Sequence, residues 1–103
     1  MKAGSAITEK QWQAQVLQLA GLLGWRAYHT FDSRRSAAGW PDLVLCRPPE
    51  LVVVELKTQR GRVSSAQAEW IDALRTCGVE VHVWRPDDFE AAHRRLAASR
   101  RPA

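Results

Sequence analysis

Two short stretches decide the fold of this chain: Gly39-Trp40-Pro41-Asp42 and Glu55-Leu56-Lys57. The first leads into the apolar run 43–46, and the second follows the apolar run 51–54. Both runs are rich in residues that favour a buried strand. The four residues between them, Arg-Pro-Pro-Glu at 47–50, are typical of a turn. The pattern predicts a hairpin of two buried strands with polar groups at its open end.

The expected register of this hairpin brings two carboxylates together. If Cys46 lies opposite Leu51, the numbers of paired residues sum to 97, and Asp42 lies opposite Glu55. Side chains alternate along a strand, so Lys57 projects from the same face as Glu55. Two facing carboxylates repel each other, and a divalent cation between them removes that repulsion. The sequence therefore predicts a metal site on the hairpin with an ammonium group beside it.

The composition is that of one small basic domain. The 103 residues are 46% hydrophobic and 25% charged, without a shift that would separate two domains. We expect a single domain over 1–103, with a core at about 8–98 and flexible ends at 1–7 and 99–103. Lys and Arg total 15 against 11 acidic residues, a net charge of +4. This excess favours a polyanionic partner, although a solvated basic surface explains the charge alone equally well. It is clustered at Arg34-Arg35, Arg60 and Arg62, Arg94-Arg95, and Arg100-Arg101.

Cysteine and hydropathy patterns limit the compartment. Cys46 and Cys77 each stand in an apolar stretch and are expected to be small buried residues rather than a disulfide framework. The three histidines have no zinc-ligand spacing. No signal peptide is present, and no apolar run approaches the ~18 residues of a membrane span. We expect no membrane attachment and a reducing cytoplasm, that of a bacterium or of a phage-infected host cell.

The first part of the chain predicts a helix and a strand. Thr8 with Gln11 forms a capping box ahead of an amphipathic pattern that ends at Gly24. Its apolar stripe is Trp12, Val16, Leu19, Ala20 and Leu23. Residues 25–30 then alternate weakly, as in a strand.

The last part predicts two more helices and a fourth strand. Ser64 with Gln67 forms a second capping box, and the helix that follows ends at Gly78. Residues 79–84 alternate clearly as a strand, and a last helix begins at residue 86 with Phe89, Ala92 and Leu96 on one stripe. The order is α-β-β-β-α-β-α, a mixed α/β layer with helices against a sheet.

The combination of Glu9, Gly39-x-Pro41-Asp42, Glu55-x-Lys57 and Gln67 resembles the PD-(D/E)xK nuclease superfamily. It is most similar to the virus-type replication-repair nuclease (VRR-NUC) domains, over roughly residues 8–85. Each motif alone is common by chance, but their order on apolar strands is fairly specific. The resemblance implies a restriction-endonuclease-like α-β-β-β-α-β core with a mixed sheet flanked by helices, to which this chain adds a C-terminal helix.

The resemblance also implies a deoxyribonuclease that depends on Mg²⁺ or Mn²⁺. Asp42 and Glu55 would bind the metal together with the backbone carbonyl of Leu56, because hard cations prefer oxygen ligands. Glu9 would face the same site from the first helix. Lys57 would orient the attacking water or neutralise charge on the phosphate.

Further residues are expected around this site. Gln67 would position Lys57 or a phosphate from the second helix. Two basic loops would border the metal, where a phosphate backbone has to pass. Their arginines are Arg34, Arg35, Arg60 and Arg62.

Each residue also has a structural interpretation. Asp42 could simply begin a strand, and Glu55 with Lys57 could form an ion pair on an edge strand. Glu9 lies where any carboxylate is favoured by the helix dipole. Gln67 could do no more than complete its capping box.

The leading hypothesis is a metal-dependent endonuclease for branched or four-way (Holliday-type) DNA. The alternatives are a catalytically silent nucleic-acid-binding module on the same fold and a protein–protein adaptor anchored by tryptophans. Two cuts on opposing strands need two sites, so we expect a homodimer. Five tryptophans exceed what the core of so short a chain requires, and about three are expected to be buried. These residues are Trp12, Trp25, Trp40, Trp70 and Trp84.

Overall fold

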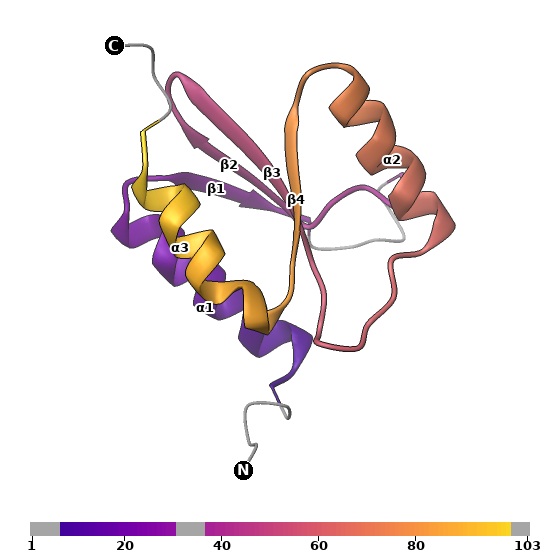
Figure 1. Cartoon of the computed structure of the whole chain (residues 1–103), viewed down its shortest axis with the longest axis horizontal. Helices are drawn as coiled ribbons and strands as arrows, with labels where there is room; N and C mark the ends of the chain where they lie inside the picture. Colours follow the sequence, from indigo (N-terminus) through magenta and orange to yellow (C-terminus); the bar gives the residue numbers. More distant parts are fainter. Residues whose placement is uncertain (1–6, 31–36, 100–103) are drawn as a thin grey trace.

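A four-stranded mixed sheet in the order β1-β2-β3-β4 forms the centre of the structure (Figure 1), a computed structural model that describes residues 7–30 and 37–99. β1, β2 and β3 are joined in antiparallel fashion, whereas β3 and β4 are parallel. The predicted order of elements is confirmed. Along the chain they are α1 (Glu9–Leu22), β1 (Arg26–His29), β2 (Leu43–Arg47), β3 (Glu50–Leu56), α2 (Ser65–Thr76), β4 (Glu80–Trp84), the 3-10 helix η2 (Pro86–Asp88) and α3 (Phe89–Ala97).

Both predicted capping boxes are present and fix where α1 and α2 begin. The Thr8 hydroxyl accepts a hydrogen bond from the backbone N–H of Gln11, whose side-chain oxygen accepts one from the N–H of Thr8. Ser64 and Gln67 exchange the same two bonds at 3.1 and 2.8 Å. These bonds satisfy N–H groups that have no partner within a helix. The second box also holds the Gln67 side chain in a defined place.

The predicted register of the hairpin is confirmed. Cys46 pairs with Leu51, and the numbers of paired residues sum to 97 throughout β2 and β3. The turn is shorter than predicted, because Arg47 pairs with Glu50 and leaves Pro48-Pro49, joined by a cis peptide bond, between the strands. A proline cannot donate to a ladder, whereas Arg47 and Glu50 can extend it.

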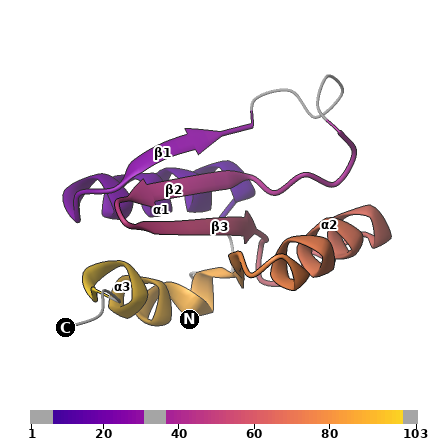
Figure 2. The same ribbon diagram turned by 90° about the horizontal axis from the view of Figure 1, so that it is seen from above.

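Helices cover both faces of the sheet. α1 and α3 lie together on one face and α2 lies on the other (Figures 1 and 2). The larger core, under α1 and α3, contains Trp12, Val16, Leu19, Ala20, Trp25, Leu43, Leu45, Val52, Val54, Leu56, Trp84, Ala92 and Leu96. Val53, Ile71 and Val81 form the smaller core under α2. Side chains alternate along β2 and β3, so Asp42 and Glu55 belong to the face that α2 covers.

The tryptophans divide as expected, with three in the core. Trp12, Trp25 and Trp84 are buried, whereas Trp40 and Trp70 are partly exposed. Within residues 7–30 and 37–99, no helix combines the length and the apolar character needed to cross a membrane.

Two burial expectations are wrong. Cys77 is exposed, because it lies at the C-cap of α2 beyond the part of the helix that contacts the sheet. Cys46 is partly buried, and both thiols are free. On α3 the side chain of Phe89 is 40% exposed, whereas Arg95 is buried beside Leu96.

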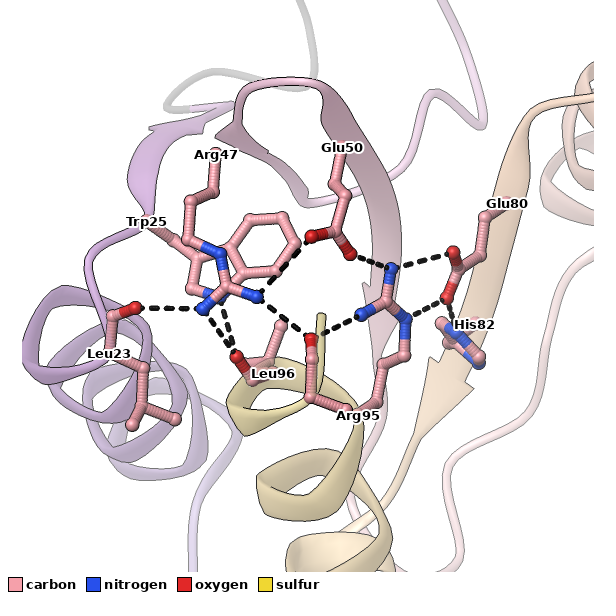
Figure 3. Close-up of polar contacts among 9 residues, drawn as sticks. Leu23, Trp25, Arg47, Glu50, Glu80, His82, Arg95 and Leu96 are labelled. Atoms are coloured by element: carbon pink, nitrogen blue, oxygen red, sulfur yellow. Dashed lines mark hydrogen bonds and ion pairs between the residues drawn. The ribbon is translucent and has the colours of Figure 1, made fainter. Parts of the chain in front are cut away.

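Arg95 is buried because ion pairs surround it at the end of the sheet farthest from Asp42 (Figure 3). Its Nη2 donates to Glu50 Oε1 at 2.9 Å, and its Nε donates to Glu80 Oε2 at 2.5 Å. Burial alone would raise the pKa of Glu80, but hydrogen bonds with Arg95 and His82 outweigh it and lower this pKa to about 2. Arg95 is therefore a structural residue and not part of a basic surface.

Arg47 joins the C-terminal ends of two helices at the same place (Figure 3). It donates to the carbonyl oxygens of Leu23, Leu96 and Ala98 at 3.0, 2.9 and 2.8 Å. Its guanidinium lies 4.4 Å from the centre of the Trp25 ring. Arg47 thus fastens the C-terminal ends of α1 and α3 to the hairpin.

Candidate active site

The loop before β2 is held against the first turn of α2. Gly39 has a φ of +86°, and a Cβ at this position would lie 2.4 Å from the backbone carbon of Ala66. Only glycine permits both this conformation and this approach. Trp40 then packs edge-on against Trp70, with ring centres 4.9 Å apart. These contacts set the position of the segment that leads to Asp42.

Asp42 is fixed through both its backbone and its side chain. Its carbonyl oxygen accepts a hydrogen bond from the N–H of Thr30 at 3.0 Å. Its Oδ2 accepts one from the N–H of Leu56 at 2.8 Å, across the open end of the hairpin. The confirmed register, continued by one residue, places Asp42 opposite Glu55.

Glu55 is the most deeply buried carboxylate of the described residues, at 1% exposure. It lies on β3, between β2 and β4, so its ion pair with Lys57 is present but is not on an edge strand. Its Oε2 accepts a hydrogen bond from Gln67 Nε2 at 3.0 Å and lies 3.3 Å from Lys57 Nζ. Its Oε1 is buried and has no hydrogen-bond partner among the described residues.

The environment of Glu55 favours its protonated form in the metal-free protein. Burial is the largest cause, and the negative charge of Asp42 adds to it. Lys57 opposes both effects, yet the pKa of Glu55 rises from 4.5 to about 7. The fold therefore holds a carboxylate that would gain from a nearby cation.

Lys57 and Gln67 both reach Glu55. Lys57 projects from the same face as Glu55, as expected, and its N–H continues the β3–β4 pairing by donating to the carbonyl of Trp84 at 3.1 Å. Gln67 has two roles at once, since its Oε1 caps α2 while its Nε2 donates to Glu55. The capping interpretation and the site interpretation of Gln67 are thus compatible.

Glu9 and Leu56 differ in how they relate to this site. Glu9 is exposed in the first turn of α1, on the opposite side of the sheet from α2. Among residues 7–30 and 37–99, no three acidic, histidine or cysteine side chains gather closely enough to hold a metal. The structure therefore does not bring Glu9 together with Asp42 and Glu55. The Leu56 side chain is in the main core, so only its backbone is available at the site.

The expected DNA-binding loops are described only in part. Arg34 and Arg35 lie outside the described residues. Arg60 and Arg62 are exposed on the loop between β3 and α2, a few residues after Lys57. The Arg85 side chain also contacts this loop, by donating hydrogen bonds to backbone carbonyls of the loop. Sequence reasoning missed Arg85, because nothing in a strand-end arginine shows which distant carbonyls it binds.

The oxygen atoms at this site fit a hard divalent cation. Asp42 and Glu55 present carboxylates from adjacent strands, and Glu55 Oε1 is buried without a partner among the described residues. Mg²⁺ is usually bound through one or two carboxylates, with waters and substrate phosphates as its other ligands. Two carboxylates without Glu9 therefore suffice as protein side-chain ligands.

Comparison with known proteins gives the fold and the family of this chain. In solved structures the chain is similar to Hjc of Archaeoglobus fulgidus, a Holliday junction resolvase from an archaeal hyperthermophile, with a TM-score of 0.56 and 20% sequence identity. The similarity covers 74% of this chain and 67% of that chain, and it shows a shared fold. A search of curated proteins found no match. The model of the VRR-NUC domain family matches residues 2–88. Since this match spans most of the sequence, the chain belongs to the VRR-NUC family of nuclease domains.

Proposed function

We propose that this nuclease domain is a metal-dependent DNA endonuclease whose site consists of Asp42, Glu55, Lys57 and Gln67. The observation that carries the proposal is the Glu55 carboxylate, buried opposite Asp42 with one oxygen lacking a partner among the described residues. A domain that only binds DNA has no need for two facing carboxylates beside a surface that meets a polyanion. A bound cation would offset the repulsion between the two carboxylates and favour their charged forms.

The chemistry follows from the residues present. Asp42 and Glu55 would hold Mg²⁺ or Mn²⁺, which, when bound, lowers the pKa of a water and neutralises charge on a phosphodiester. Gln67 and Lys57 hold Glu55 Oε2, and this leaves Oε1 for the cation. The Lys57 ammonium is also placed to stabilise charge that develops on the phosphate.

Branched or four-way DNA is the proposed substrate. Support comes from the fold shared with a Holliday junction resolvase and from the exposed arginines that follow Lys57. Symmetric cleavage of a four-way junction needs two sites, so we propose a homodimer as the active form.

The test compares Asp42→Asn and Glu55→Gln with the wild-type chain on labelled linear, flapped and four-way DNA, with and without Mn²⁺. We expect cleavage by the wild type only with the metal, preferentially of branched DNA, and none by either variant. DNA binding should be retained or strengthened in both variants, because a negative charge near the phosphates is removed. Cleavage by either variant at the wild-type rate would show that the site assignment is wrong.

Calorimetric titration of Mn²⁺ separates the proposal from its alternative. A domain that binds DNA but neither cleaves it nor binds Mn²⁺ would be a catalytically silent module on the same fold.

A further inference from the structure

Arg85, the residue after β4, is bound to the backbone of the loop that carries Arg60 and Arg62. Its Nη1 donates to the carbonyls of Thr58 and Gly61 at 2.7 and 2.6 Å and lies 3.4 Å from that of Gln59. One side-chain nitrogen thus contacts most of the turn. The loop's own backbone bond, from Gly61 N–H to Thr58 O at 3.2 Å, closes the same turn.

The start of η2 adds a second connection to this loop. The N–H of Asp87 donates to the side-chain oxygen of Gln59 at 3.2 Å, and the N–H of Arg85 donates to Asp88 Oδ2 at 2.8 Å. Arg85 is itself partly buried, whereas Arg60 and Arg62 are exposed. The partly buried Arg85 therefore shapes the backbone of the loop, and the exposed Arg60 and Arg62 remain available to solvent.

We propose that Arg85 is a positioning residue for DNA binding, which holds the 58–61 turn in the shape that presents Arg60 and Arg62 to the phosphate backbone. This inference rests on the proposed function only in taking DNA as the ligand. Without Arg85 the loop would have to be ordered during binding, and ordering flexible side chains and loops weakens affinity. A guanidinium suits this role because it is always charged and offers several donors in a fixed plane.

Salt dependence distinguishes positioning from direct contact. Each phosphate contact contributes about −0.9 to the slope of log K against log salt concentration on duplex DNA. We would measure binding to fluorescent four-way and duplex DNA by anisotropy, in EDTA, over a range of salt concentrations. Arg85→Gln should weaken binding by about ten-fold at every salt concentration with the slope unchanged, as expected when ordering is the cost.

The second measurement is a double-mutant cycle with the loop arginines. The Arg60→Ala/Arg62→Ala variant should bind DNA more weakly. Its slope of log K against log salt concentration should be shallower by about the amount expected for two phosphate contacts. Adding Arg85→Gln to that variant should then change affinity little, because Arg85 acts through the residues already removed. Arg75→Gln is the matched control, since Arg75 also binds a backbone carbonyl, that of Val81, on a different part of the chain. It should leave DNA affinity unchanged.

Three results would overturn the inference. A slope reduced by about 0.9 in Arg85→Gln would mean that Arg85 contacts a phosphate directly. Additive losses in the cycle would mean that it acts independently of Arg60 and Arg62. Unchanged affinity would make it purely structural. If Arg85→Gln does not fold, Arg85→Lys keeps the charge and a donor, and the same cycle applies to it. Because the readout is binding in EDTA, failure to find cleavage would count against the proposed nuclease activity and not against this inference.

Discussion

Glu55 is the side chain whose ionisation this fold alters most clearly among the residues of the site. In water the pKa of a glutamate is about 4.5, but burial and the charge of Asp42 raise the pKa of Glu55 to about 7. Between these values the metal-free folded protein keeps a proton that the unfolded chain has lost. Stability of the metal-free protein should therefore fall as pH rises from about 4.5 to about 7 and change little from this cause above that range.

Glu55→Gln tests this linkage. The neutral amide cannot titrate, so the variant should be more stable than wild type at pH 8, by an amount on the order of 3 kcal/mol at most, and should gain little at pH 4.5. Urea unfolding in EDTA at both pH values measures the difference. An equal difference at the two values would mean that Glu55 is not the group responsible.

Lys57 is proposed to stabilise charge on the phosphate rather than to bind the metal. Its Nζ lies 3.3 Å from Glu55 Oε2, and the Lys57 side chain is 13% exposed. Lys57→Ala should reduce the cleavage rate by about two orders of magnitude, the usual effect of removing a charge-stabilising catalytic group. Calorimetry should still show Mn²⁺ binding at pH 8. Loss of Mn²⁺ binding would instead assign Lys57 a structural role in holding Glu55.

At the scale of elements, the contact between the 37–40 loop and α2 joins two parts of the site. Gly39→Ala would place a Cβ 2.4 Å from the backbone of Ala66, at a φ of +86°. We expect a loss of about 2 kcal/mol or more in the free energy of unfolding, because both the contact and the backbone angle are strained. Cleavage should fall as well, since Asp42 and Gln67 would shift relative to each other.

Gly21→Ala is the control for that substitution. Gly21 lies within α1, and a Cβ there meets no atom within 4 Å. Alanine should stabilise the protein by about 0.5–1 kcal/mol, because it lowers the entropy lost when a helix forms. Urea unfolding of both variants measures the two effects, and a Gly39→Ala protein as stable as wild type would contradict the strain argument.

The hairpin and the helix starts could be predicted because their causes are local. Apolar runs flanking a proline turn set the register, and each capping box needs only residues three apart. The same reasoning placed Asp42 opposite Glu55 and Lys57 beside Glu55. It could not separate the two roles of Gln67, since a cap and a hydrogen bond across the fold use different atoms of one side chain.

Other features depend on packing between distant segments. The sequence pattern placed Phe89 rather than Arg95 in the core. It could not show that Arg95 is buried, because the acidic partners of Arg95 come from the distant positions 50 and 80. It assigned Glu9 to the metal site through resemblance alone, whereas the structure leaves Glu9 exposed and outside any group of three potential ligands among the described residues.

The two ends of the sheet carry different sets of charged side chains. Arg47 and Arg95 tie secondary structure together at one end, and the carboxylates with their lysine gather at the other. The contacts of Arg47 and Arg95 do not involve the charged groups of the candidate site. Substitutions at Asp42 or Glu55 should thus leave the fold intact.

The domain is expected to assemble as a homodimer. One site of this kind cuts one strand, so a chain that resolves four-way DNA symmetrically should act as a pair about a two-fold axis. Light scattering of the free protein at micromolar concentration should give a mass near twice 11.6 kDa, and on four-way DNA the mass of the complex should exceed that of the DNA by the same amount. A monomer in both conditions would contradict the dimer and weaken the junction substrate, while the nuclease assignment would stand.

Gln67 has a consequence for how such a domain can change during evolution. Glutamate is as good as glutamine in a capping box, so Gln67→Glu would keep the start of α2. The same exchange would replace the donor to Glu55 with a third negative charge beside a buried carboxylate. One base change in a glutamine codon is enough to make it. A lineage could therefore lose the proposed cleavage in a single step while its helix, its sheet and its exposed arginines persisted, and a glutamate at position 67 would identify such an inactive descendant.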